Sequence, residues 1–292
     1  MYRSDLQAAL AGLNDRSLPH FNQLVIWMLL ASGALLACLP FTMHEGPRQG
    51  PASVLWWLPE SLLSAGWLFW LFRGLLVAGG LLWLFSRGLP WSCWVMTAGF
   101  TGLWSMHVEN THNTAHIFNM ANMLLVIQSL WITANAAEIR SAIAERRFWQ
   151  TPLVPRWVSL ASIAYIGLFH TAAGLSKLSH SGWGWASGTS LQLWTYLWGR
   201  PASPTTQMIL ASRTFTRWLQ IGTIVIETSG ILAIFPRLRP WIGLALVAFY
   251  IGVLATFDYG FQLNALFTAM YLLPLEAWMT RTATRRMASQ TN

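Results

Sequence analysis

The sequence is dominated by apolar stretches of about 20 residues that few charges interrupt. A helix of that length covers the ~30 Å hydrocarbon core of a bilayer, because each residue adds ~1.5 Å along the axis. Only 10% of the residues are charged and 54% are hydrophobic, whereas a soluble domain has roughly 25% charged residues. The pattern therefore predicts an all-α integral membrane protein, a polytopic helical bundle with additional interfacial helices, rather than a barrel.

Eight of these stretches are predicted to be transmembrane helices. They lie at residues 22–42, 62–85, 91–106, 114–134, 157–176, 217–235, 239–257 and 261–278. The third is the shortest and contains Gly99 and Gly102, so it could be tilted, partly re-entrant or buried among other helices, and six spans is the alternative count. Residues 137–149 are too polar to span and carry apolar residues at helical spacing, which predicts an interfacial helix. One transmembrane domain over residues 1–292 accounts for the whole chain.

The basic residues are distributed unevenly between the loops that join these spans. With the N-terminus inside, twelve fall on the cytoplasmic side and five on the other side, and cytoplasmic loops carry the excess of Lys and Arg. We therefore expect a multi-pass protein of the cell (inner) membrane, with short cytoplasmic N- and C-terminal tails. No basic face with interleaved aromatic residues is present in the sequence, so the expected partner is membrane lipid and not nucleic acid.

Few ionisable residues lie inside the predicted spans, and each is a candidate for function because burying it in hydrocarbon is unfavourable. Glu227 lies near the middle of the span at 217–235. His170 and Lys177 are seven residues apart, which places them on one helix face, and His112 and His116 share a face in the same way. Structural roles are the alternatives: Glu227 would bond to a neighbouring Ser or Thr, and Lys177 would extend to the interface at the end of its span.

Lys177 is the single lysine among the 18 Lys and Arg residues. An amine that is removed from water can lose its proton and act as a general base, whereas arginine stays protonated. This difference favours Lys177 as a general base or nucleophile, and His170 can point into the same internal cavity because it shares the helix face of Lys177. The histidines are too few and too scattered for the histidine boxes of membrane di-iron oxidases, so no metal is expected.

Three segments resemble the vitamin K-dependent γ-carboxylase family, also called the horizontally transferred transmembrane (HTTM) domain. The run YIGLFHTAAGLSKLSHSGWGWASGTSLQLWTYLW has the family's A-G-x-x-K-L sequence followed by W-x-x-G. The runs HNTAHIFNMANMLL and VIETSG resemble its histidine-bearing and acidic segments, with His116 and Glu227 at the matching positions. The resemblance covers about residues 105–275 and is nearest to the bundle-only bacterial branch, which includes proteins that mature a sporulation-delaying peptide toxin.

The resemblance implies a lyase-type reaction with a reduced quinone, similar to vitamin K or menaquinol, as cofactor. In the family a lysine deprotonates the quinol so that oxygen can add, and the strong base that results abstracts a carbon-bound proton so that carbon dioxide can add. The catalytic residues are then Lys177 as the base, with His116, His170 and Glu227 as cavity partners that position or tune it. The residues implied as cofactor-binding are Trp185, Gly174 and Asn113. A small secreted peptide and a partner subunit are the implied partners.

Two other functions stay open on the sequence. The chain could be a non-enzymatic membrane partner in the maturation, export or immunity of a secreted peptide toxin. It could also be a transporter in which Glu227 carries the proton, although repeated halves and paired broken spans are not visible in the sequence.

Overall fold

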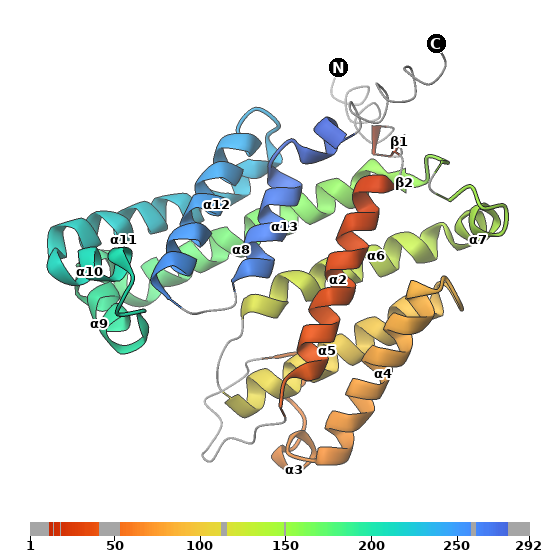
Figure 1. The fold of residues 1–292 in the computed structure, drawn as a ribbon, viewed down its shortest axis with the longest axis horizontal. Helices are drawn as coiled ribbons and strands as arrows, with labels where there is room; N and C mark the ends of the chain where they lie inside the picture. Colours follow the sequence, from red (N-terminus) through yellow and green to blue (C-terminus); the bar gives the residue numbers. More distant parts are fainter. Residues whose placement is uncertain are drawn as a thin grey trace. The chain divides into compact units, whose positions relative to one another are not determined.

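The computed structural model describes residues 12–13, 15–17, 19–40, 53–111, 116–148, 150–257 and 261–279. The chain divides into two compact units, Met1–Val158 and Ser159–Asn292. Nearly all regular structure in the described ranges is helical (Figure 1), which confirms the predicted all-α class. The strands found there are a single antiparallel pair within unit 1, β1 (Arg16–Ser17) and β2 (Val154–Pro155). The assignment of both units to one transmembrane domain stays a prediction.

Unit 1 is built from apolar helices that pack along their lengths. They are α2 (His20–Cys38), α3 (Glu60–Leu63), α4 (Gly66–Leu84), α5 (Trp91–Thr111), α6 (His116–Ala134) and α7 (Ala136–Ala144). Buried amides join α2 to α6: Asn22 Nδ2 donates to Gln128 Oε1 at 2.8 Å, and Gln128 Nε2 donates to Asn22 Oδ1 at 2.9 Å. Each amide satisfies the other, so two polar side chains can be buried between the helices.

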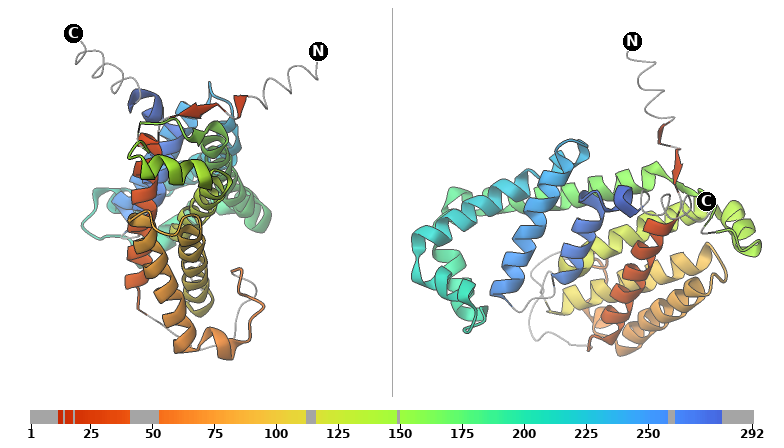
Figure 2. Two further views of the ribbon diagram at one scale, coloured as in Figure 1. Left: turned by 90° about the vertical axis from the view of Figure 1, so that its right-hand side faces the viewer. Right: turned by 45° about the horizontal axis from the view of Figure 1, so that its top comes forward.

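Helices α4 and α5 lie side by side (Figure 2) and touch through their backbones. A Cβ atom on Gly99 would lie 2.3 Å from the Leu76 nitrogen, and one on Gly79 would lie 2.4 Å from the Met96 nitrogen. Only glycine permits this approach. The glycines of the third predicted span therefore reflect close helix packing, in agreement with the alternative that this span is buried among other helices.

The third predicted span was too short, since α5 continues from residue 106 to Thr111. The apolar pattern ends near residue 106 because polar residues follow, but the helix continues and a polar side chain of this part is buried inside the unit. Glu109 is buried, and its Oε1 accepts a hydrogen bond from Ser53 Oγ at 2.8 Å.

Arg73, which lies inside a predicted span, has a structural role in unit 1. Its Nε donates to the carbonyl of Ala37 and its Nη2 donates to that of Leu39 at 3.5 Å. These carbonyls belong to the C-terminal end of α2, where backbone acceptors lack helical partners and a positive charge is favourable. The guanidinium also lies 4.9 Å from the centre of the Trp70 ring.

Unit 2 contains most of α8 (Arg156–Ser181) and all later elements. These are η1 (Gly182–Ala186), α9 (Thr189–Trp198), α10 (Pro204–Ala211), α11 (Arg213–Thr228), η2 (Gly230–Ile234), α12 (Arg239–Thr256) and α13 (Gln262–Leu272). The connection between the predicted spans at 157–176 and 217–235, which contains four tryptophans, is thus largely helical. Hydrogen bonds tie it to the C-terminal end of α12, where Arg200 N and Thr206 Oγ1 both donate to Thr256 O, at 2.9 and 3.2 Å.

Four described helical segments are long and apolar enough to cross a membrane: His20–Cys38, Gly66–Leu84, Arg156–Ala186 and Arg239–Thr256. Segments Phe118–Ala134 and Ala136–Ala144 would make a fifth, but they are bent by 79°. All eight predicted spans coincide with helices, and α7 coincides with the predicted interfacial helix. However, α11 and α13 have only 16 and 11 residues. The structure thus supports a membrane protein, while eight spans and cytoplasmic termini stay predictions.

Candidate functional site

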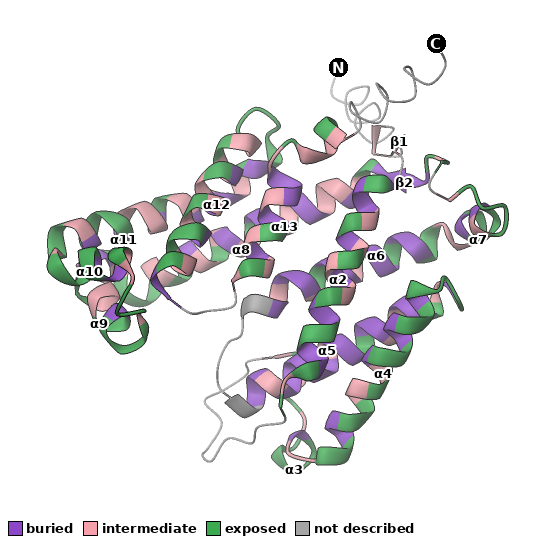
Figure 3. Cartoon of the chain, viewed as in Figure 1, coloured by how far each residue is buried: buried purple, intermediate pink, exposed green. Residues whose placement is uncertain are grey.

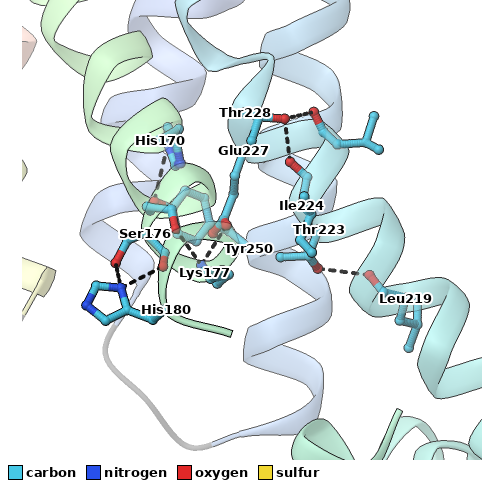
Figure 4. Close-up of polar contacts among 12 residues, drawn as sticks. His170, Ser176, Lys177, His180, Leu219, Thr223, Ile224, Glu227, Thr228 and Tyr250 are labelled. Carbon is cyan, nitrogen blue, oxygen red and sulfur yellow. Dashed lines mark hydrogen bonds and ion pairs between the residues drawn. The ribbon is translucent and has the colours of Figure 1, made fainter. Parts of the chain in front are cut away.

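Lys177 and Glu227 form an ion pair inside unit 2. Lys177 Nζ donates to Glu227 Oε2 at 2.6 Å and lies 3.5 Å from the carbonyl of Ala173 (Figure 4). The Glu227 side chain is 6% exposed and that of Lys177 is 25% exposed. The amine therefore points into the unit and contacts a nearly inaccessible carboxylate. Two residues selected separately from the sequence are brought together, although they lie 50 positions apart.

The pair is held where α8 crosses the C-terminal end of α11. A Cβ atom on Gly174 would lie 2.7 Å from the Thr228 nitrogen and 3.0 Å from Glu227 Cβ. Glycine at this position lets the two helices approach until Lys177, almost one turn later, reaches the carboxylate. Close packing is therefore a sufficient reason for Gly174, and the cofactor-binding role implied by the resemblance stays a prediction.

Helix α11 ends immediately after Glu227, and α8 stabilises this end. Thr171 Oγ1 donates to the carbonyl of Thr228 at 3.3 Å and accepts from the Ile231 nitrogen at 2.8 Å. The first residues after the break continue as the short helix η2. Thr171 thus satisfies one carbonyl and one amide that the interrupted helix leaves without helical partners.

His170 lies near the pair and contacts a residue that the sequence analysis did not select. His170 and Tyr250 of α12 are both buried, their rings meet edge to face with centroids 5.5 Å apart, and Tyr250 Oη lies 3.4 Å from His170 Nε2. Figure 4 shows both side chains beside Lys177 and Glu227. In the sequence, Tyr250 differs from its neighbours only by placing a hydroxyl group within the apolar stretch at residues 239–257, which was a weak indication of a role in the site. Its position over His170 depends on how α12 packs, which the sequence does not reveal.

Trp185 covers the amine on another side. Lys177 Nζ lies 5.4 Å from the centroid of the Trp185 ring, a distance at which the ring face attracts a cation. Gln220 of α11 fixes the short helix η1 that carries this tryptophan. Its Nε2 donates to the Trp185 carbonyl at 2.7 Å, and its Oε1 accepts from the Gly188 nitrogen at 2.7 Å. Gln220 is buried and was also not selected from the sequence.

The other two predicted site residues belong to unit 1. His116 is the first residue of α6, but its side chain is outside the described part of the structure. Asn113 lies outside the described residues. The roles of His116 as a cavity partner and of Asn113 as a cofactor ligand therefore stay predictions.

The described site offers groups that can exchange protons: an amine, a carboxylate, an imidazole and a phenol, next to an indole ring. No three His, Cys, Asp or Glu side chains within the described ranges are close enough to hold a metal ion together. His180, one turn beyond Ser176, is exposed, and its Nδ1 lies 2.8 Å from the Ser176 carbonyl of its own helix. The arrangement around Lys177 is suited to accepting and holding a proton in an apolar environment.

Comparisons with protein-family models, with curated proteins and with solved structures give no match for this chain. The resemblance to the γ-carboxylase family thus depends on the sequence motifs alone.

Proposed function

We propose that the chain is a γ-carboxylase-like membrane enzyme in which the Lys177–Glu227 pair accepts a proton from a lipid quinol. The main support is the 2.6 Å contact between the single lysine and a carboxylate that is 6% exposed. The resemblance adds two further elements to this proposal. Oxygen and carbon dioxide would be further reactants, and a small secreted peptide would be the molecule that is modified.

The short contact gives Lys177 a route to its neutral form. The pair can exist as ammonium and carboxylate, or as amine and carboxylic acid after one proton moves across the hydrogen bond. Low polarity favours the second form relative to water, because it contains no separated charges. Glu227 would then hold the proton while the Lys177 amine accepts another. The face of Trp185, 5.4 Å away, would stabilise the ammonium that results.

The residues around Lys177 fit a reduced quinone in their chemistry. Such a molecule is a flat apolar ring with weakly acidic hydroxyl groups, and when bound it would supply the acidic hydroxyl and a ring that reacts with oxygen. Trp185 offers an aromatic surface, and the Lys177 amine and Glu227 carboxylate offer proton acceptors. His170 and Tyr250 are buried beside them and keep water away from the inner side of the pair.

Oxygen-dependent consumption of a reduced naphthoquinone by the purified chain tests this function. Removal of a general base reduces turnover by roughly 10²–10⁴-fold. The turnover of Lys177→Ala should therefore be lower than that of the wild type by a factor in this range, and the turnover of Glu227→Gln should also be reduced. His180→Ala is the matched control, since this histidine is exposed on the same helix and its hydrogen bonds are to Ser176 and Ser179. Turnover by Lys177→Ala equal to that of the wild type would remove the proposal.

The exposed apolar surface of α9 and α10 favours one alternative. Figure 3 shows exposed positions on both helices. The large apolar residues among them include Leu193, Trp194, Tyr196 and Met208. A non-enzymatic membrane partner in the maturation, export or immunity of a secreted peptide could use such a surface to hold the peptide or a partner subunit. In that case Lys177→Ala would keep the cellular phenotype, and Trp194→Ala together with Tyr196→Ala would lose it.

The interruption of α11 beside Glu227 favours the third hypothesis, a proton-coupled transporter. Broken helices often mark ion sites in transporters. Proton-coupled flux that is lost in Glu227→Gln and kept in Lys177→Ala would support transport over catalysis.

A further inference from the structure

An apolar cavity of about 80 Å³ lies within unit 1, between α2, α4, α6 and α7. Its apolar lining includes Trp27 and Leu30 of α2, Leu84 of α4, Ile132 of α6 and Ile143 of α7. Trp27 and Leu84 are exposed, so the cavity opens along the outer surface of these helices. On the same measure of volume one water molecule needs ~10–15 Å³, so the cavity has room for a short length of hydrocarbon chain.

Arginines are concentrated at the end of unit 1 where this cavity lies. Arg140 Nη1 donates to the carbonyl of Leu89 at 3.2 Å, and Leu89 itself lines the cavity. Arg87 lies between Ser86 and Leu89, which both contribute to the lining, and Arg146 follows the lining residue Ile143. The three arginines are exposed at this position.

The carboxylates nearby are already paired with other arginines. Glu138 binds Arg16, and Glu145 binds Arg147 with a contact of 2.6 Å. Among the described residues no carboxylate forms an ion pair with Arg87, Arg140 or Arg146. The mouth of the cavity therefore carries a surplus of positive charge next to an apolar lining.

We propose that unit 1 binds an anionic phospholipid, with part of one acyl chain in this cavity and the phosphate at Arg87 and Arg140. The lining is mostly apolar, with Gln23 and Ser86 as exceptions, so an acyl chain gains from burial there whereas a purely polar anion would lose most of its hydration. The arginine surplus favours a lipid with net negative charge over a zwitterionic one. The amphipathic helix α7 supplies both kinds of contact that such a lipid needs: Ile143 for the acyl chain and Arg140 for the phosphate.

This proposal is independent of the quinol function, because all the residues involved belong to unit 1 and the Lys177–Glu227 pair belongs to unit 2. Loss of quinol turnover would leave it unaffected, and loss of lipid selectivity would leave the function of the pair unaffected.

The test measures the binding of phosphatidylglycerol and of phosphatidylcholine with the same acyl chains to the delipidated full-length protein in detergent. Thermal unfolding and native mass spectrometry provide two readouts. Each arginine near an anionic headgroup contributes ~1 kcal/mol, so two predict roughly a 30-fold preference for phosphatidylglycerol. Arg87→Gln with Arg140→Gln should reduce the preference to about 2-fold or less, and Arg237→Gln, an exposed arginine of unit 2, should keep it.

Ile143→Trp, which fills the cavity, should weaken the binding of both lipids while leaving the arginines in place. If the double arginine variant does not fold, the comparison of Ile143→Trp with the wild type still tests whether the lipid binds in this cavity. Three results would overturn the proposal: equal affinity of the wild type for the two lipids, full preference in the double arginine variant, or equal stabilisation of the wild type by inorganic phosphate.

Discussion

Lys177 and Glu227 depend on each other because neither charge is favourable alone in an apolar part of unit 2. Opposite charges 2.6 Å apart attract strongly when little water screens them. The same contact allows a proton to pass from nitrogen to oxygen without either group leaving its position. The pair can therefore contribute to the stability of the helix crossing and also act as a store for one proton.

A double-mutant cycle measures the first of these contributions. Lys177→Ala and Glu227→Ala should each destabilise the protein, because each leaves a charge without its partner, and the double variant should be less destabilised than the sum. We expect a coupling energy of about 1–3 kcal/mol, reduced from the value for fully buried pairs because Lys177 is 25% exposed. Thermal unfolding in one detergent provides the comparison, and additive effects would show that the pair has no stabilising role.

The sequence predicted part of this site for definite physical reasons. A carboxylate or a lysine in an apolar stretch is conspicuous, and a spacing of seven residues places His170 beside Lys177 on one face. Tyr250 and Gln220 give a weaker signal, since tyrosine and glutamine in a helix are also explained by packing. Their roles arise from the position of α12 over His170 and of α11 beside η1, which depend on tertiary contacts.

At the scale of secondary-structure elements, the crossing of α8 over α11 and η2 determines the geometry of the site. Small residues allow it: Gly174 approaches Thr228, and Gly167 meets Gly230, whose carbonyl would lie 2.7 Å from a Cβ atom on Gly167. In a membrane, close backbone packing and interhelical hydrogen bonds replace the hydrophobic effect as the force that joins helices. The apolar pattern predicted a span to residue 235, yet the regular α-helix ends at Thr228, because apolar composition does not indicate where a neighbouring Thr171 can stabilise a break.

Gly174→Leu tests the importance of this crossing. The new side chain would meet the Thr228 backbone and Glu227 Cβ, so the helices must separate and the ion pair must lengthen. A loss of about 1–3 kcal/mol in stability is expected, together with loss of quinol turnover. Gly222→Ala is the control, because nothing lies within 4 Å of a Cβ atom there, and it should leave both properties intact. A Gly174→Leu variant as stable and active as Gly222→Ala would contradict the packing role.

A second prediction concerns the contact between α2 and α6. Asn22→Leu leaves the buried amide of Gln128 without its two hydrogen bonds, which should reduce stability by about 1–2 kcal/mol. Asn22→Leu combined with Gln128→Leu removes both polar groups and should recover part of that loss. Thermal unfolding shows which of the two variants is more stable. A double variant that is less stable than Asn22→Leu would show that the two amides are not mutual partners.

For the whole molecule, the distribution of arginines makes a prediction about membrane orientation. Arg87 and Arg140 fall in different connections, and the charge count assigns both connections to the cytoplasmic side. In unit 1 the hydrogen bond from Arg140 to Leu89 places these two connections at the same end. This agrees with the expectation that both connections lie on one side of the membrane, and the assignment of that side to the cytoplasm stays a prediction.

Cysteine labelling in intact cells tests the orientation. In a chain with Cys38 and Cys93 replaced by alanine, Thr189→Cys should react with a membrane-impermeant maleimide because this exposed residue lies in the connection predicted outside. The exposed residue Gln150 is predicted inside, so Gln150→Cys should react only after permeabilisation. The opposite pattern would reverse the topology, and equal labelling of both positions in intact cells would exclude this arrangement of spans.

The turnover of a reduced naphthoquinone by Lys177→Arg tests the central claim most directly. Arginine retains a positive charge beside Glu227 and can keep the ion pair, but it stays protonated and cannot accept a proton. Activity should therefore fall by at least ~100-fold, while the thermal unfolding midpoint stays closer to that of the wild type than the midpoint of Lys177→Ala does. Wild-type turnover by Lys177→Arg would show that only the charge is needed, and would contradict the role of Lys177 as a base.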